Sequence, residues 1–215
     1  MRLPWYKNKL YNFAFKYGMN MKTPLSILDD EYWTTRYMDK QTGWDIGYAS
    51  TPLKEYIDQL KDTSVKILIP GCGNAYEAEY LAQKNFTNVT LLDISELLVN
   101  NLKSKFSDNP IRIIHEDFFN HTEKYDIILE QTFFCALHSS QRNDYAVKMK
   151  ALLKDDGKLA GVLFNKEFEG GPPFGGNEDE YRQLFSNYFS SVKINTCYNS
   201  IEPRKGTEVF MILQN

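Results

Sequence analysis

The sequence predicts an α/β protein in which helices cover both faces of a seven-stranded, mostly parallel sheet. From Val65 onward, short runs of aliphatic and β-branched residues alternate with helical patterns, the order typical of parallel strands joined by helices. The first run ends in a glycine turn, as expected for a strand that leads directly into a helix. Residues 199–207 leave no room for a helix between the last two runs, so the last strand should run antiparallel.

Seven short segments fit the strand pattern. The predicted strands are Val65–Pro70, Asn88–Asp93, Ile111–His115, Tyr125–Glu130, Lys158–Phe164, Val192–Cys197 and Glu208–Leu213. Capping residues mark the helices between them, because Ser95, Ser140 and Asn177 each precede an apolar repeat at helical spacing. The helix after Ser140 should end at Asp156-Gly157, since glycine commonly follows the last turn of a helix.

A helical cover is expected ahead of the sheet. Apolar periodicity predicts helices over residues 25–38 and 51–60, the second with proline at its first helical position. A chain of this length fits one domain. We therefore expect a single domain over residues 1–215, with the N-terminal helical cover at 1–62 and the sheet core at 63–215.

Composition and charge exclude several classes of function. The chain has 25 basic and 28 acidic residues and a net charge of −3, without the basic surplus typical of nucleic-acid binders. No stretch approaches the ~18 apolar residues of a membrane span. Neither the three cysteines nor the three histidines have the spacing of a disulfide framework or a metal site. We expect a cytoplasmic monomer that acts on a small molecule, with no nucleic-acid or membrane partner and no metal.

The glycine turn after the first strand indicates a ligand that lies close to the backbone. Residues 67–75 read Ile-Leu-Ile-Pro-Gly-Cys-Gly-Asn-Ala, and Gly71-Cys72-Gly73 stands where α/β proteins bind ligands, at the carboxyl end of the first strand. A dinucleotide site would carry a third glycine at the position of Tyr76. The pattern therefore favours another adenosine-containing cofactor, although the glycines alone also fit a simple tight turn.

Polar and aromatic residues at three further strand ends extend the predicted cofactor site. Asp93, followed by Ile94, ends the second strand, where a carboxylate can accept hydrogen bonds from both ribose hydroxyls. Asp117 and Phe118 follow the third strand and are placed to contact an adenine, although an ordinary strand-end turn explains this pair equally well. Glu130-Gln131 ends the fourth strand, where a switch in strand order opens a crevice and polar atoms should face a ligand.

These motifs together resemble the thiopurine S-methyltransferase family, and within it the halide and thiol methyltransferases of bacteria and plants. The resemblance extends from about Trp33 to near the C-terminus. It rests on Gly43–Gly47, Pro70–Gly73, Leu92–Ser95, Glu116–Phe119, Thr132–Ala136, Gly170–Phe174 and Pro203–Gly206. It implies a class I methyltransferase fold, which is a Rossmann-like three-layer sandwich, and S-adenosylmethionine as the methyl donor.

The resemblance also implies roles for the cover. Trp33, Tyr37 and Trp44 would close over the cofactor, and aromatic rings beside a sulfonium act as cation–π partners. Plant relatives carry a tryptophan at the position of Tyr37. For each ring the alternative is a hydrophobic plug over the end of the sheet.

The acceptor follows from the resemblance as a class. Family members methylate thiols, thiopurines, thiocyanate, hydrogen sulfide, iodide or bromide, which implies in-line displacement by a small, soft nucleophile. Such a reaction needs no obligatory general base, so we name no catalytic acid or base. Phe164 and Arg204, with the loop over residues 170–176, are predicted to lie on the acceptor side. Two alternatives stay open, namely a sensor that binds S-adenosylmethionine without turnover and a methyltransferase for a larger acceptor.

Overall fold

The computed structural model describes residues 28–215 and contains a seven-stranded sheet in the order β3-β2-β1-β4-β5-β7-β6. The strands are β1 (Ile67–Pro70), β2 (Val89–Asp93), β3 (Arg112–His115), β4 (Tyr125–Gln131), β5 (Leu153–Phe164), β6 (Ser191–Thr196) and β7 (Glu208–Gln214). Strand β7 inserts between β5 and β6 and pairs antiparallel with both, whereas β1 to β5 pair parallel. The seven predicted strands and the antiparallel last strand are confirmed.

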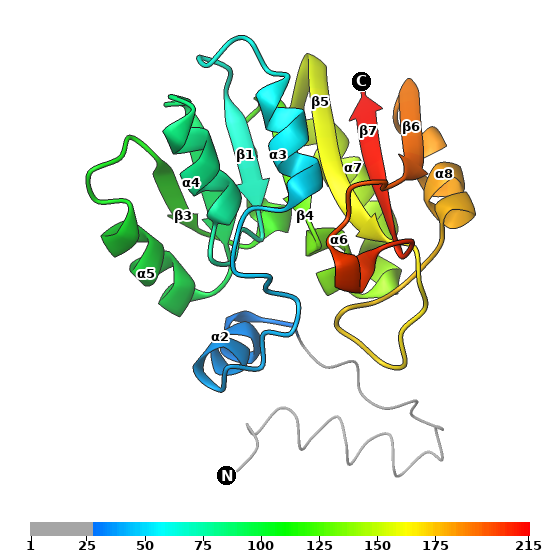
Figure 1. Ribbon diagram of the computed structural model, residues 1–215, viewed down its shortest axis with the longest axis horizontal. Helices are drawn as coiled ribbons and strands as arrows, with labels where there is room; N and C mark the ends of the chain where they lie inside the picture. Colours follow the sequence, from blue (N-terminus) through cyan, green and yellow to red (C-terminus); the bar gives the residue numbers. More distant parts are fainter. Residues whose placement is uncertain (1–27) are drawn as a thin grey trace.

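Helices cover both faces of the sheet and form a three-layer sandwich (Figure 1). One layer contains α3 (Thr51–Asp58), α4 (Tyr76–Gln83) and α5 (Glu96–Lys105), and the opposite layer contains α6 (Phe133–Ala136), α7 (Arg142–Leu152) and α8 (Glu178–Ser186). Helix α2 (Asp30–Met38) stands apart from both layers, beyond the carboxyl ends of the central strands. The predicted fold class is therefore confirmed.

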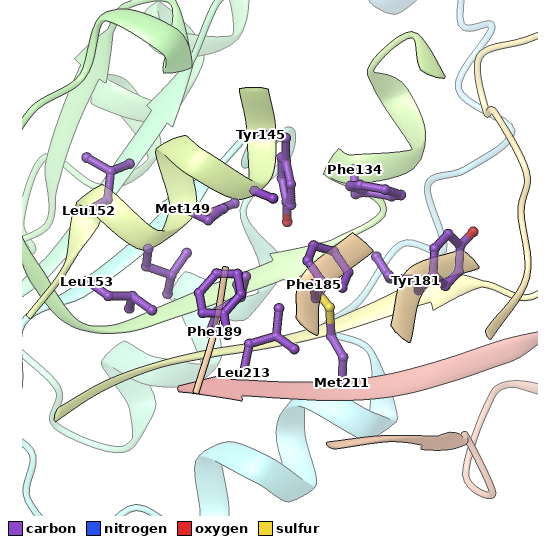
Figure 2. Packing of buried hydrophobic residues seen from close by; sticks show 14 of the residues in the cluster. Phe134, Tyr145, Met149, Leu152, Leu153, Tyr181, Phe185, Phe189, Met211 and Leu213 are labelled. Atoms are coloured by element: carbon purple, nitrogen blue, oxygen red, sulfur yellow. The ribbon is translucent and has the colours of Figure 1, made fainter. Parts of the chain in front are cut away.

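Alternate side chains of each buried strand pack into two separate hydrophobic cores, one on each face of the sheet. Ile67 and Ile69 pack with α3 and α4, whereas Leu68 between them joins the cluster under α7 and α8. This alternation is the period-two geometry of a strand buried on both faces. The cluster under α7 and α8 is rich in aromatic rings; Figure 2 shows Phe134 and Tyr145 on the helical side of this cluster and Met211 and Leu213 on β7.

Side-chain caps mark the starts of α2, α5 and α8, but two predictions were wrong. Ser140 does not cap α7, which begins at Arg142 after Gln141, and Gln141 makes no side-chain cap bond. The side chain of Ser95 accepts a hydrogen bond from Leu98 N at 3.4 Å, and that of Asn177 accepts one from Glu180 N at 3.0 Å, as predicted. The helix predicted to end at Asp156-Gly157 ends earlier, at the residue before Leu153. Leu153 is fully buried and pairs with β4, so burial and strand pairing end the helix before glycine is reached.

Helix α2 of the cover begins at Asp30, whereas the periodicity placed residues 28 and 29 in the same helix. Helix α2 starts at Asp30, because the carboxylate of Asp29 accepts a hydrogen bond from Tyr32 N at 3.1 Å and caps the first turn. Residues 25–27 of the predicted helix lie outside the described residues. Between residues 28 and 215, no helix is long and apolar enough to cross a membrane.

Candidate functional site

A pocket opens at the carboxyl ends of β1 to β4, beneath the N-terminal cover. This is where open α/β sheets commonly bind ligands, because the strand order reverses there. Most of the predicted cofactor residues line it, namely Trp33, Tyr37, Trp44, Gly71, Cys72, Gly73, Asp93, Ile94, Asp117, Phe118 and Gln131. The structure thus brings together side chains from six separate stretches of the chain, while their roles toward a ligand stay predictions.

The glycine turn after β1 brings bare backbone to the pocket wall. Gly71 has a φ of +57°, and a Cβ built on it would lie 2.2 Å from the ring of Phe133. A Cβ on Gly73 would lie 2.7 Å from the hydroxyl of Tyr37. Since non-bonded carbons require about 3.5 Å, neither position has room for a side chain. At Gly71 and Gly73 the turn therefore presents only its peptide groups to a ligand.

Asp93 ties the end of β2 to this turn. Its carboxylate is buried and accepts hydrogen bonds from Gly73 N at 3.0 Å and Ser95 N at 2.9 Å. Burial raises the pKa of the carboxyl, and these backbone N–H groups act in the opposite direction. A carboxylate has about four acceptor positions, so positions remain for hydroxyl groups of a ligand in the pocket.

The residues after β3 form a strand-end turn beside the pocket. The carboxylate of Asp117 accepts a hydrogen bond from Phe119 N at 2.9 Å and so caps a 3-10 turn. Phe118 is buried and packs edge-to-face on Phe133, with ring centroids 5.0 Å apart. Both residues also line the pocket, so the strand-end turn is part of the pocket wall, and the predicted contact with an adenine stays a prediction.

The structure corrects the prediction for Glu130. Its side chain is fully buried and lies behind the pocket wall, where Oε1 accepts a hydrogen bond from Phe134 N at 2.8 Å. The other oxygen, Oε2, has no hydrogen-bond partner within residues 28–215, and burial raises the pKa of the carboxyl to about 8. Neighbouring residues of a strand point in opposite directions, so Gln131 lines the pocket and Glu130 does not.

Three aromatic rings of the cover close the pocket from above the turn. Trp44 packs edge-to-face on Trp33 and Tyr37, with centroid distances of 5.6 Å and 5.9 Å. Burial raises the pKa of the Tyr37 hydroxyl well above its usual value. The cover is fastened to α5, because Thr34 Oγ1 shares a hydrogen bond of 2.7 Å with Ser95 Oγ.

The two predicted acceptor residues do not line the pocket. Phe164 is buried at the end of β5, and the guanidinium of Arg204 stands over its ring at 5.2 Å. Arg204 donates a hydrogen bond to the backbone oxygen of Trp44 at 2.6 Å. Its charge is thus directed at the protein. From the predicted acceptor loop, Pro172 and Pro173 do reach the pocket.

Apart from Pro172 and Pro173 of the predicted acceptor loop, the sequence-based prediction missed much of the remaining wall. An apolar end of the pocket is formed by Phe119, Phe133, Leu137, Pro172 and Pro173. Among residues 28–215, the charged residues lining the pocket are all acidic; they are Asp45, Glu77, Asp93, Glu116 and Asp117. The position of Leu137 shortly after the fourth strand was a signal that could have found it, whereas nothing in the local sequence marks Glu77.

These features fit an adenosyl sulfonium compound. The glycine turn leaves space against the backbone, the buried Asp93 offers acceptor positions, and the acidic wall complements a positive charge. Similar solved structures include the TehB-like SAM-dependent methyltransferase from Corynebacterium glutamicum (TM-score 0.63, 14% identity, 86% of this chain and 97% of that one). Another is 1,6-didemethyltoxoflavin-N1-methyltransferase from Burkholderia thailandensis (TM-score 0.66, 15% identity, 100% and 93%). The fold is that of the class I S-adenosylmethionine-dependent methyltransferases.

Sequence comparison narrows the class to a family. Residues 28–212 match the family model of thiopurine S-methyltransferase (TPMT). The chain is 32% identical over 184 residues to probable thiol methyltransferase 2 of Arabidopsis thaliana, covering 82% of this chain and 81% of the relative. Thiocyanate methyltransferase 1 of Brassica oleracea is 29% identical with the same coverage, and thiopurine S-methyltransferase of Vibrio parahaemolyticus is 27% identical over 80% and 86%. The chain belongs to the TPMT family, as its motifs predicted.

Proposed function

We propose that this methyltransferase transfers the methyl group of S-adenosylmethionine to a small, soft nucleophile, with a thiol as the favoured acceptor. The observation that carries the proposal is the apolar end of the pocket, together with the absence of any basic residue among the described residues that line it. Such a wall offers no ion pair to a strongly hydrated anion. Polarizable acceptors lose water most easily, so thiols, thiopurines, hydrogen sulfide, thiocyanate, iodide and bromide fit it better than oxygen nucleophiles.

The polar end of the pocket, formed by Gly71–Gly73, Asp93 and Asp117, would hold the cofactor. In this assignment Asp93 accepts hydrogen bonds from the ribose hydroxyls, and Asp117 with Phe118 contacts the adenine. The glycine turn passes beneath the cofactor with its peptide groups exposed. Trp33, Tyr37 and Trp44 lie on the side of the sulfonium, where each ring contributes on the order of 1 kcal/mol of cation–π attraction.

When bound, S-adenosylmethionine supplies an electrophilic methyl carbon on a positively charged sulfur. Asp93 and Asp117 would hold this donor, and the apolar wall of Phe133, Leu137 and Pro172 would hold the acceptor beside it, so that the methyl group could be displaced in line. A thiol has a pKa near ~8.5 and is partly ionised before it reacts, so its proton is lost to solvent. The chain contributes alignment, worth roughly 7–11 kcal/mol, and a wall that excludes water.

The test is release of S-adenosylhomocysteine with a panel of acceptors. We expect turnover with an aromatic thiol and hydrogen sulfide, and slower turnover with thiocyanate, iodide and bromide. Asp93→Ala serves as the control variant, since it should lose activity at low cofactor concentration. Tight cofactor binding by calorimetry without turnover of any acceptor would instead favour a sensor or a methyltransferase for a larger substrate.

A further inference from the structure

Arg204 connects the loop between α2 and α3 to the strands β5 and β7. Its Nη2 donates a hydrogen bond to Trp44 O at 2.6 Å, and its Nη1 donates one to Glu208 Oε1 at 3.4 Å. The guanidinium also lies over the ring of Phe164, 5.2 Å from its centroid. Only 11% of the Arg204 side chain and 4% of the Glu208 side chain are exposed. The contact is therefore shielded from water, where charge-assisted hydrogen bonds are strong.

The residue that Arg204 holds is part of the pocket wall. Trp44 lines the pocket and packs edge-to-face on both Trp33 and Tyr37. A hydrogen bond to its backbone oxygen holds the loop at a fixed distance from the sheet and thereby positions the indole. The three aromatic rings of the cover consequently depend on a side chain that is 160 residues away in the sequence.

The next residue of the loop has a second anchor on the other side of the pocket. The carboxylate of Asp45 accepts hydrogen bonds from Asn74 Nδ2, immediately after the glycine turn, and from Tyr76 OH at 3.4 Å. Trp44 and Asp45 are thus held by two different segments of the core. One anchor follows β1 and the other precedes β7, so the loop spans the pocket between them.

We propose that Arg204 is a positioning residue that holds the Trp44 loop over the pocket, with Glu208 and Phe164 orienting its guanidinium. Arginine suits this task because its planar fork can donate in two directions while one face stacks on a ring, which a lysine ammonium cannot do. The proposal rests on the proposed function only in assigning the cofactor to this pocket. It replaces the sequence-based prediction that Arg204 lies on the acceptor side of the site.

Calorimetry of S-adenosylmethionine binding to Arg204→Met and Arg204→Lys tests the proposal without requiring turnover. We expect the Kd to rise about tenfold in Arg204→Met, as expected for loss of a charged hydrogen bond, and the lysine variant to recover part of the loss. Lys205→Met is the matched control, because Lys205 is exposed, pairs with Glu202 alone among residues 28–215, and its substitution removes the same charge. Unchanged cofactor affinity in folded Arg204→Met would overturn the proposal.

Two further readouts separate positioning from direct attraction of an acceptor. Acrylamide should quench tryptophan fluorescence more strongly in Arg204→Met than in the parent protein, and Trp44→Phe in the same background should abolish that difference. The KM values for iodide and for an uncharged thiol should change by the same factor in Arg204→Met. A rise in KM confined to iodide, with the cofactor Kd unchanged, would restore the direct role. If no acceptor is turned over, the proposed function fails while the binding and quenching experiments still decide the role of Arg204.

Discussion

The two ends of the pocket are built by different means. The polar end consists of the glycine turn, Asp93 and Asp117, which are fixed by backbone conformation and by hydrogen bonds to peptide N–H groups. The apolar end consists of side chains from α6, its neighbouring turns and the proline loop. Hydrogen-bond geometry tolerates little change, whereas apolar walls tolerate exchange of similar volumes. A fold of this kind can therefore keep its cofactor while it changes its acceptor.

The largest expected effect concerns Glu130, which is fully buried near the end of β4, behind the pocket wall. Burial raises the pKa of this carboxyl to about 8 in the folded protein, against 4.5 for the ordinary group. Between these pH values the unfolded chain is ionised at this position and the folded chain is not. The Glu130 carboxyl therefore lowers the free energy of unfolding as the pH rises from 4.5 to 8, and its effect stays constant above that range.

Urea unfolding of Glu130→Gln and the parent protein at pH 5 and pH 8 measures this effect. Between pH 5 and pH 8, we expect the free energy of unfolding of the variant to rise relative to that of the parent by on the order of 4 kcal/mol. Glu202→Gln, which removes an exposed acid, should change nothing. Parallel pH profiles for Glu130→Gln and the parent would show that the carboxyl titrates normally and that the wall is less tightly packed than described.

The next effect tests how strictly backbone geometry fixes the polar end. Gly71→Ala places a Cβ against the ring of Phe133 and forces alanine into the left-handed region. We expect a loss of about 2–3 kcal/mol in stability and loss of cofactor binding. Gly170→Ala is the control, because Gly170 also has a positive φ but nothing lies within 4 Å of its Cβ position. If Gly71→Ala and Gly170→Ala lost equal stability, the positive φ alone would explain the loss, and the packing of the turn against Phe133 would not be its cause.

Asp93→Ala should weaken cofactor binding while leaving the acceptor preference unchanged. The variant removes the carboxylate that bonds Gly73 N and Ser95 N, and we expect a loss of 1–3 kcal/mol, roughly that of a charged hydrogen-bond partner. Calorimetry with S-adenosylhomocysteine gives the affinity, and melting temperature separates it from unfolding. Unchanged affinity would exclude Asp93 from ribose binding.

The smallest expected effect concerns the apolar end. Leu137→Ala enlarges it, and we expect the ratio of kcat/KM for an aromatic thiol over iodide to rise about tenfold or less, since a few methylene groups discriminate by ~1–3 kcal/mol. The cofactor Kd should stay constant. A change in cofactor affinity equal to the change in selectivity would mean that the two ends are not independent.

Much of the fold and part of the site were predictable from local patterns. The strands follow from aliphatic runs, and the caps at Ser95 and Asn177 follow from side chains that bond their own helix. Gly71–Gly73 and Asp93 were found because each stands at a strand end, and parallel strands bring such ends to one edge of the sheet. A structural feature could be predicted from the sequence wherever the contact that determines it joins residues only a few positions apart.

Long-range packing decided the rest. The sequence by itself determined the fold class, the family and the strand ends that line the pocket, because periodicity, capping and glycine turns are local properties. Only the tertiary structure placed Glu130 behind the wall, ended α7 before Leu153 and directed Arg204 at the backbone of Trp44. Those outcomes depend on which segments meet in space, and the buried guanidinium of Arg204 bonds the acceptors it meets there, since leaving a buried charge unpaired costs several kcal/mol.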